Sequence, residues 1–232
     1  MKIDLEENII DLKNLVKKEQ EEIVEKIATT EANWIFDLGK EPLIRFKLLE
    51  LLDREYILLI TLHHIIFDGW STGIFFKELG EYYRIYSSGK SSKLDNLKIQ
   101  YADFALWQRG WLKEEKLEEQ LKYWQEELNG IPDLLELPTD KVRPKELSYR
   151  GDSYRCVLPD GTKAGLEKIA KEEQASMFMV LLAIFKILLY RYTSQKDIVV
   201  GTPVANRNYQ EIEALIGFFV NTLAPVSYTH LR

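Results

Sequence analysis

The segment Glu55–Ser71 joins an apolar stretch of strand length to a polar turn, and this combination limits the folds open to the chain. Tyr56–Ile60 is apolar throughout and too short for a helix, which predicts a buried strand. The adjacent histidines His63–His64 stand at the end of that strand. Asp68–Gly69 then breaks the apolar pattern, because glycine tolerates a positive φ and lets its backbone N–H approach a ligand closely. Since Ser71 can cap a helix, we predict a strand, a polar turn and a helix in that order.

Strand and helix patterns are mixed along the rest of the chain. Apolar residues recur at three- and four-residue steps in segments that we predict as helical: Ile9–Ile27, Ile74–Ser88, Tyr101–Leu128, Lys163–Tyr192 and the shorter Glu211–Ile216. Strand-like runs occupy Leu43–Leu51, Glu55–Leu62, Asp152–Leu158, Asp197–Val200 and Phe218–Leu223, the first two forming a hairpin. We expect Phe178–Leu189 to be buried, because it is apolar nearly all round. The order of elements, without an internal repeat, predicts an α/β fold.

Composition and charge exclude several classes of function. The net charge of −6 and the lack of a basic cluster interleaved with aromatics argue against a nucleic-acid surface. Lys186 interrupts Met177–Tyr190, the best candidate for a membrane span. The N-terminus lacks the order of a signal peptide, and the single cysteine, Cys156, excludes an internal disulfide. We expect a cytoplasmic protein with no membrane or nucleic-acid partner, in which Cys156 fills the core.

Three interpretations of the histidine pair are open. In the first, His63 and His64 are hydrogen-bonded structural residues. In the second, they bind a metal ion with Asp68; this is disfavoured, because neighbouring strand residues point to opposite faces and no third His or further carboxylate lies close by. In the third, one imidazole acts as a general acid or base and Asp68 orders the turn. We favour the third interpretation and expect no bound metal.

The histidine segment also carries a family resemblance. His63–Ser71 resembles the His-His-x-x-x-Asp-Gly signature of the condensation domains of nonribosomal peptide synthetases, in a superfamily that includes chloramphenicol acetyltransferase. Other segments resemble successive motifs of that family in the family's order: Tyr101–Gln108, Tyr123–Trp124, Leu137–Asp140 with Arg143–Pro144, Asp197–Arg207 and Ile216–Thr222. The likeness extends from about Phe36 to Leu223. It implies a two-lobed α/β architecture like that of chloramphenicol acetyltransferase.

The resemblance implies an amide-forming acyltransferase. In the family, a donor acyl group and an acceptor amine are carried as thioesters on the 4'-phosphopantetheine arms of two peptidyl carrier domains, which enter opposite ends of a tunnel between the lobes. No cofactor would be bound directly, and an adenylation domain would stand next to this domain in the parent protein.

The resemblance also assigns roles to individual residues. His64 would face the tunnel, position the amine and take its proton; an α-amino group has a pKa of about 8 and needs no strong base. The backbone N–H of Gly69 would approach the oxyanion. His63 would be structural. We expect Asp68 to pair with Arg207, because a carboxylate that follows a buried strand needs a partner.

The likeness to the family is incomplete at both ends of the chain. Two earlier motifs of the family are missing, and the C-terminal residues diverge from it. We therefore expect about half of a condensation domain: a partial N-terminal lobe at 1–145, a partial C-terminal lobe at 146–226 and a non-native tail at 227–232, which contains His230. Two alternatives stay open: a stand-alone acyltransferase of the same superfamily, or a non-catalytic module that docks carrier domains or recruits other enzymes.

Overall fold

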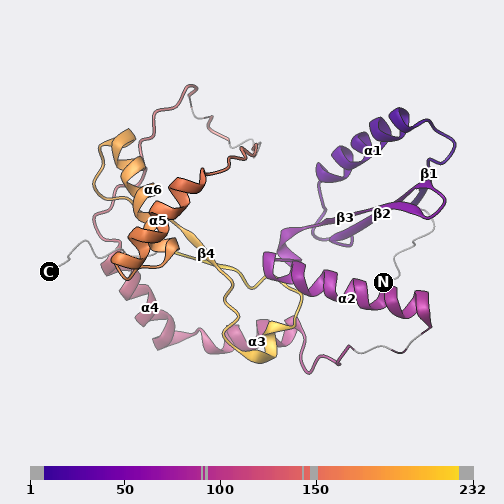
Figure 1. Cartoon of the computed structure of the whole chain (residues 1–232). Helices are drawn as coiled ribbons and strands as arrows, with labels where there is room; N and C mark the ends of the chain where they lie inside the picture. Colours follow the sequence, from indigo (N-terminus) through magenta and orange to yellow (C-terminus); the bar gives the residue numbers. More distant parts are fainter. Residues whose placement is uncertain (1–7, 90, 92–93, 143, 147–150, 225–232) are drawn as a thin grey trace. The chain divides into compact units, whose positions relative to one another are not determined.

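A computed structural model of the chain describes residues 8–89, 91, 94–142, 144–146 and 151–224 (Figure 1). The chain divides into two compact units. Unit 1 comprises Met1–Lys113 and Pro203–Thr222, and unit 2 comprises Glu114–Thr202 and Leu223–Arg232. The fold is α/β, as predicted. The lobe boundary expected near 145 lies inside unit 2 and stays a prediction, and the tail at 227–232 lies outside the described residues.

Unit 1 is built on a three-stranded sheet of order β1-β2-β3. β1 (Ile9–Asp11) runs parallel to β2 (Ile44–Leu52), and β2 pairs antiparallel with β3 (Glu55–Leu62). The turn between β2 and β3 places Arg54 at a φ of 72°. The predicted hairpin is therefore confirmed, and it delivers the chain to the histidine pair.

Two expectations for this sheet were wrong. β3 is an edge strand, and its Tyr56 and Leu58 side chains are 51% and 43% exposed, so it is not fully buried. The N-terminal segment predicted as helical opens instead with β1, and helix α1 (Lys17–Ala32) begins only at residue 17. The backbone pairing of β1 with β2 explains the difference, because a partner strand outweighs a local helical spacing.

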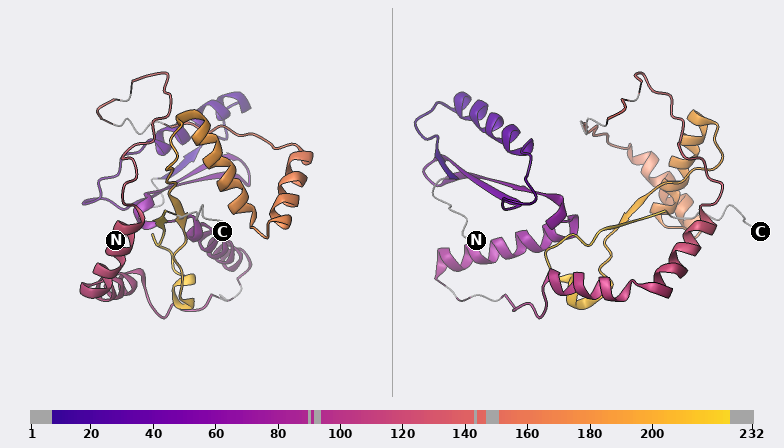
Figure 2. Two further views of the ribbon diagram at one scale, coloured as in Figure 1. Left: turned by 90° about the vertical axis from the view of Figure 1, so that its left-hand side faces the viewer. Right: turned by 180° about the vertical axis from the view of Figure 1, so that it is seen from behind.

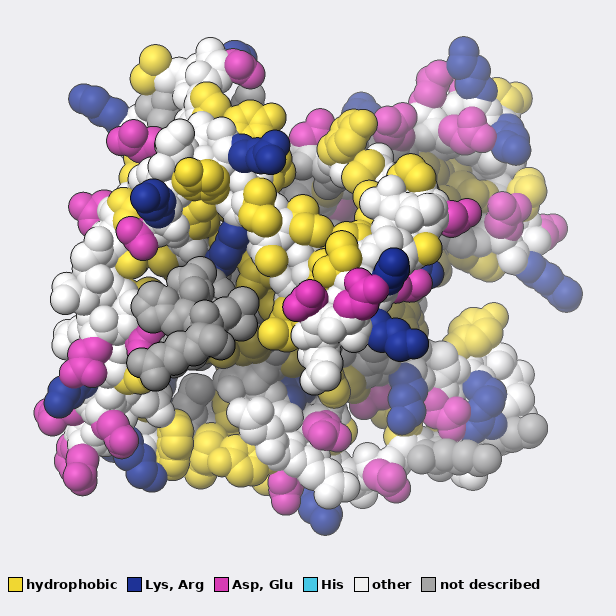
Figure 3. Space-filling model, turned by 60° about the vertical axis from the view of Figure 1, so that its left-hand side comes forward, with side chains coloured by type: hydrophobic (Ala, Val, Ile, Leu, Met, Phe, Trp, Pro, Cys, Tyr) yellow, Lys and Arg dark blue, Asp and Glu magenta, His cyan; other side chains and the backbone are white. Residues whose placement is uncertain are grey.

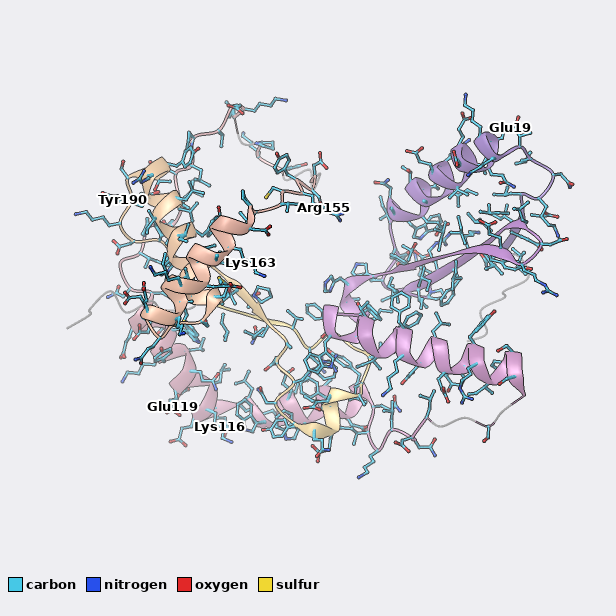
Figure 4. All side chains as sticks on the ribbon, viewed as in Figure 1. Glu19, Lys116, Glu119, Arg155, Lys163 and Tyr190 are labelled. Atoms are coloured by element: carbon cyan, nitrogen blue, oxygen red, sulfur yellow. The ribbon has the colours of Figure 1, made fainter. Side chains whose placement is uncertain are left out.

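Helices α1 and α2 lie on opposite sides of the sheet (Figures 1 and 2). The buried Gln20 joins α1 to the strands, because its Nε2 donates to the backbone oxygens of Leu12 at 3.0 Å and Leu51 at 2.8 Å. Glu19 lies beside it on the exposed part of α1 (Figure 4). α2 (Gly69–Ser88) begins directly after the histidine segment, as predicted.

The end of the chain's described part returns to unit 1 and completes its core. α3 (Tyr101–Trp111) and the short α7 (Gln210–Glu213) contribute to a buried cluster. Its members are Phe104, Ile212, Leu215 and Phe219, with Ile99 and Tyr101 packed against them. β4 (Thr202–Val204) and β5 (Asn221–Leu223) form a two-stranded sheet, so the strand predicted at Phe218–Leu223 is shorter than expected.

Unit 2 contains α4 (Glu114–Glu127), α5 (Asp160–Glu172) and α6 (Met177–Thr193). Lys163 on α5 and Tyr190 on α6 mark the two adjacent helices in Figure 4. The single long helix predicted across this region is therefore wrong: the chain bends by 108° between α5 and α6, where Ser176 caps α6 by accepting from Met179 N at 3.2 Å. The prediction of two helices within Tyr101–Leu128 is confirmed.

Two other predictions in unit 2 were wrong. Neither Asp152–Leu158 nor Asp197–Val200 forms a strand. Cys156 is exposed and does not fill the core. Short β-prone segments become strands only when a neighbouring strand supplies hydrogen-bond partners.

Many apolar side chains are exposed. Hydrophobic side chains lie among charged ones on the face drawn in Figure 3. On α6, Phe178 and Phe185 are 52% and 45% exposed, whereas Val180 and Leu189 are buried, so the expected burial of the whole segment was wrong. Among the described residues, no single helix is long and apolar enough to cross a membrane, although the bent pair of α5 and α6 passes the test by length and composition.

Candidate active site

The two histidines occupy different environments at the end of β3. His63 is half-buried, and its ring lies edge-on to Phe36 with 5.8 Å between centroids. Its Nδ1 accepts a hydrogen bond from Ile65 N at 3.1 Å and so caps a single 3₁₀ turn, His64–Ile66. His64 is the first residue of that turn and is exposed. The ring of His63 therefore stabilises the turn, while the ring of His64 is presented at the surface of unit 1.

The carboxylate of Asp68 is the centre of a buried network. Asp68 is 1% exposed and is the N-cap of α2, since its Oδ1 accepts from Ser71 N at 2.8 Å and from Ser71 Oγ at 2.7 Å. Its Oδ2 accepts from Phe219 N at 3.0 Å. Asp68 thus fixes the start of α2 and holds residue 219 beside it.

Arg207 is the charged partner of Asp68. Its Nη2 lies 3.1 Å from Asp68 Oδ1, and both side chains are almost fully buried. Its Nη1 donates to the carbonyl oxygens of Ile212 at 2.6 Å and Leu215 at 2.7 Å. The guanidinium also lies 4.0 Å from the centre of the Phe219 ring. The expected Asp68–Arg207 pair is therefore present, and both its members belong to unit 1.

Ser71 completes the network and was not recognised from the sequence as part of the site. It is fully buried, and its Oγ accepts from Gly217 N at 3.1 Å and from Arg207 Nη2 at 3.1 Å. The N-cap of α2 is Asp68 and not Ser71, since Ser71 already lies within the first turn. The only signal in the sequence is a small hydroxyl residue three positions after a capping aspartate.

The charge state of Asp68 follows from these contacts. Burial acts to raise the pKa of the Asp68 carboxyl. Hydrogen bonds from the Ser71 hydroxyl and amide and from the Phe219 amide, together with the charge of Arg207, outweigh burial and hold the pKa below its ordinary value. Asp68 is thus an ionised structural group at neutral pH, and it is shielded from any substrate.

Gly69 is the first residue of α2 and is exposed. Its φ is not positive, contrary to the expectation from the sequence, because Gly89 and Gly130 are the positive-φ glycines among the described residues. A Cβ at Gly69 would meet nothing within 4 Å. Its N–H belongs to the first turn of a helix, where backbone donors lack intrahelical partners. The catalytic role expected for Gly69 stays a prediction.

The site contains no evident metal centre. Within the described ranges, no three His, Cys, Asp or Glu side chains are grouped as metal ligands. Asp68, the third ligand in the metal interpretation, already has every contact described above within the buried network. The arrangement is instead an exposed imidazole beside a rigid, ion-paired support.

The fold and this support define a condensation-type protein, and the comparisons identify the family directly. The family model described as "Condensation domain" matches residues 2–230. The chain belongs to the condensation domain family. Members of this family catalyse amide bond formation in nonribosomal peptide synthetases.

Individual relatives agree with this assignment. A linear gramicidin synthase of Brevibacillus parabrevis is 47% identical over 222 residues, which cover 96% of this chain and 4% of the synthase chain. The X-domain in its complex with OxyB from teicoplanin biosynthesis superposes with a TM-score of 0.82 at 26% identity, over 92% of this chain and 47% of that one. The first condensation domain of the CDA synthetase has the same fold, with a TM-score of 0.68 at 21% identity. The chain spans 47% of each of these two solved chains, close to the half expected.

Proposed function

We propose that this chain is part of a condensation domain that joins a carrier-bound donor acyl thioester to a carrier-bound acceptor amine. The observation that carries the proposal is the exposed His64 imidazole at the head of a 3₁₀ turn, followed immediately by the buried Asp68–Arg207 pair. A group that transfers protons must be accessible to substrate and held by a rigid support. Family membership supplies the reaction class.

The proposed reaction is a transfer of the acyl group from sulfur to nitrogen. The amine nitrogen attacks the thioester carbonyl carbon, a C–N bond forms, and the C–S bond breaks to release the thiol of the donor arm. His64 positions the amine and takes one proton from the nitrogen as the tetrahedral adduct forms, and that proton can pass to the departing sulfur. The Gly69 N–H, at the positive end of α2, donates to the developing oxyanion.

The proposal includes partners and location. Both substrates are carried on 4'-phosphopantetheine arms of peptidyl carrier domains, and an adenylation domain lies next to this domain in the parent protein. The small share of the gramicidin synthase that the chain covers is consistent with one part of a much larger synthetase. We place the protein in the cytoplasm, since its single cysteine suits a reducing compartment.

A second function has one observation in its favour. The X-domain, to which the chain is structurally similar, was solved in a complex with OxyB. A condensation-type fold can thus serve as a binding partner for another protein. A module that only docks proteins has no need of an exposed imidazole at residue 64.

Reconstitution with loaded carriers separates the candidate functions. The complete domain containing this sequence is mixed with a donor carrier bearing an acyl thioester and an acceptor carrier bearing an aminoacyl thioester, and intact-protein mass spectrometry follows the acceptor. We expect the donor mass to appear on the acceptor carrier. Transfer only to a free amine or alcohol would favour the stand-alone acyltransferase, and carrier binding without transfer would favour the docking module.

A further inference from the structure

We propose that Phe218 is a positioning residue that sets the orientation of the His64 imidazole. The two rings lie edge to face, with 5.3 Å between centroids and 86° between planes. Phe218 is 38% exposed, so its ring lies at the surface beside the exposed histidine. The inference rests on the proposed catalytic role of His64.

The backbone around Phe218 is fixed on three sides. Its own carbonyl oxygen accepts from Tyr101 OH at 2.8 Å. Before it, Gly217 N donates to Ser71 Oγ at 3.1 Å, and after it, Phe219 N donates to Asp68 Oδ2 at 3.0 Å. The buried network therefore reaches His64 through a ring whose backbone cannot shift without breaking these bonds.

The His64 ring needs such a support. A catalytic histidine is usually oriented by a hydrogen bond to its second ring nitrogen. Among the residues that the structure describes, no hydrogen bond to either His64 ring nitrogen is present, and the ring contact with Phe218 is the one that can restrict its rotation. Both nitrogens stay available to substrate while the aromatic contact limits the ring to few orientations.

The contact also explains why the Asp68–Arg207–Ser71 network lies behind a residue that does no chemistry. The network holds the segment 217–219 against the start of α2, and Phe218 is the member of that segment whose side chain points to His64. Loss of its aromatic ring should therefore impair the chemical step more than substrate binding.

The test is a double-mutant cycle in the complete domain with loaded carriers. Phe218→Leu should lower kcat about tenfold and leave KM for the acceptor carrier within about twofold, because misplacing a catalytic group weakens the reaction step. Phe218→Tyr keeps the ring and should retain the wild-type rate. In a His64→Ala background, Phe218→Leu should have no further effect on the residual rate. Phe76→Leu, at a 59% exposed position of α2, is the matched control.

Three outcomes would overturn the inference: an unchanged kcat in Phe218→Leu, an equal loss in Phe218→Tyr, or the same loss from Phe218→Leu with and without the His64 imidazole. If Phe218→Leu does not fold, Phe218→Met is measured by the same criteria. Should His64→Ala retain full activity, the proposed function itself fails; should His64→Ala be inactive while Phe218→Leu is normal, only the role of Phe218 fails.

Discussion

Arg207 Nη2 lies 3.1 Å from Asp68 Oδ1 although 139 positions separate the two residues in sequence, and both side chains are buried. The pair joins the start of α2 to the segment that returns to unit 1 near its end. Because each partner also bonds backbone groups, the pair fixes the local path of both segments. His64 and Phe218 are each adjacent in space to this support.

Arg207→Ala should destabilise unit 1 by about 3–5 kcal/mol, because it leaves the buried Asp68 charge unpaired. It also removes the donor to the carbonyls of Ile212 and Leu215. The free energy of unfolding in urea measures the effect. Arg155→Ala, at an exposed position labelled in Figure 4, is the matched control and should change stability by less than about 0.5 kcal/mol. A loss below about 1 kcal/mol in Arg207→Ala would contradict a structural role for the pair.

The pH dependence of stability follows from the depressed pKa of Asp68. A carboxyl whose pKa is lower in the folded state contributes stability above its unfolded pKa of about 3.9, and this contribution is lost as the pH falls through the folded pKa. The stability difference between wild type and Asp68→Asn should be constant from about pH 7 to 5 and shrink below about pH 4. Urea unfolding at each pH measures it. A difference that grows on acidification would reverse the assigned direction.

Gly217 is needed because of close packing. A Cβ there would approach Tyr101 Cε2 to 2.8 Å and Phe219 Cε2 to 3.0 Å. Gly217→Ala should therefore cost about 1–3 kcal/mol through overpacking. In Gly80→Ala, within α2, the added Cβ meets nothing within 4 Å, and the change should stabilise the chain by about 0.5–1 kcal/mol. The same sign for both variants in thermal unfolding would refute the packing argument.

A second ion pair joins α1 to the sheet. Arg45 on β2 binds Glu31 at two points, 2.8 and 3.0 Å, and its guanidinium lies 3.7 Å from the centre of the Trp34 ring. Arg45→Lys keeps the charge but loses the fork and the stacking, so we expect a loss of about 1–2 kcal/mol. Lys18→Ala, which removes an exposed pair with Glu22, should change stability by at most about 0.5 kcal/mol. Equal effects in urea unfolding would show that the geometry of Arg45 is unimportant.

The features that the sequence predicted correctly are those set by local spacing. The hairpin, the helix after the histidines and the end of that helix at Gly89, whose φ is 67°, all follow from patterns of a few residues. The Asp68–Arg207 pair was predicted because a carboxylate after an apolar strand needs a partner, and the family motif indicated where the arginine lies.

The features that were missed depend on contacts between distant segments. Asp152–Leu158 alternates like a strand but has no strand structure, because no partner strand pairs with it among the described residues. The break before α6 was visible in principle, since Ser176 precedes an apolar run as a cap does. Ser71 and Phe218 entered the site only through the fold, because their contacts cross more than a hundred positions.

The central claim is that the exposed imidazole of His64 takes part in amide formation while the buried network only supports it. The most direct measurement is the single-turnover rate of acyl transfer between loaded carriers by the complete domain carrying His64→Ala. We predict a loss of about 10²–10⁴-fold in this rate, with carrier binding and the free energy of unfolding unchanged. An undiminished rate of amide formation in this folded variant would contradict the account.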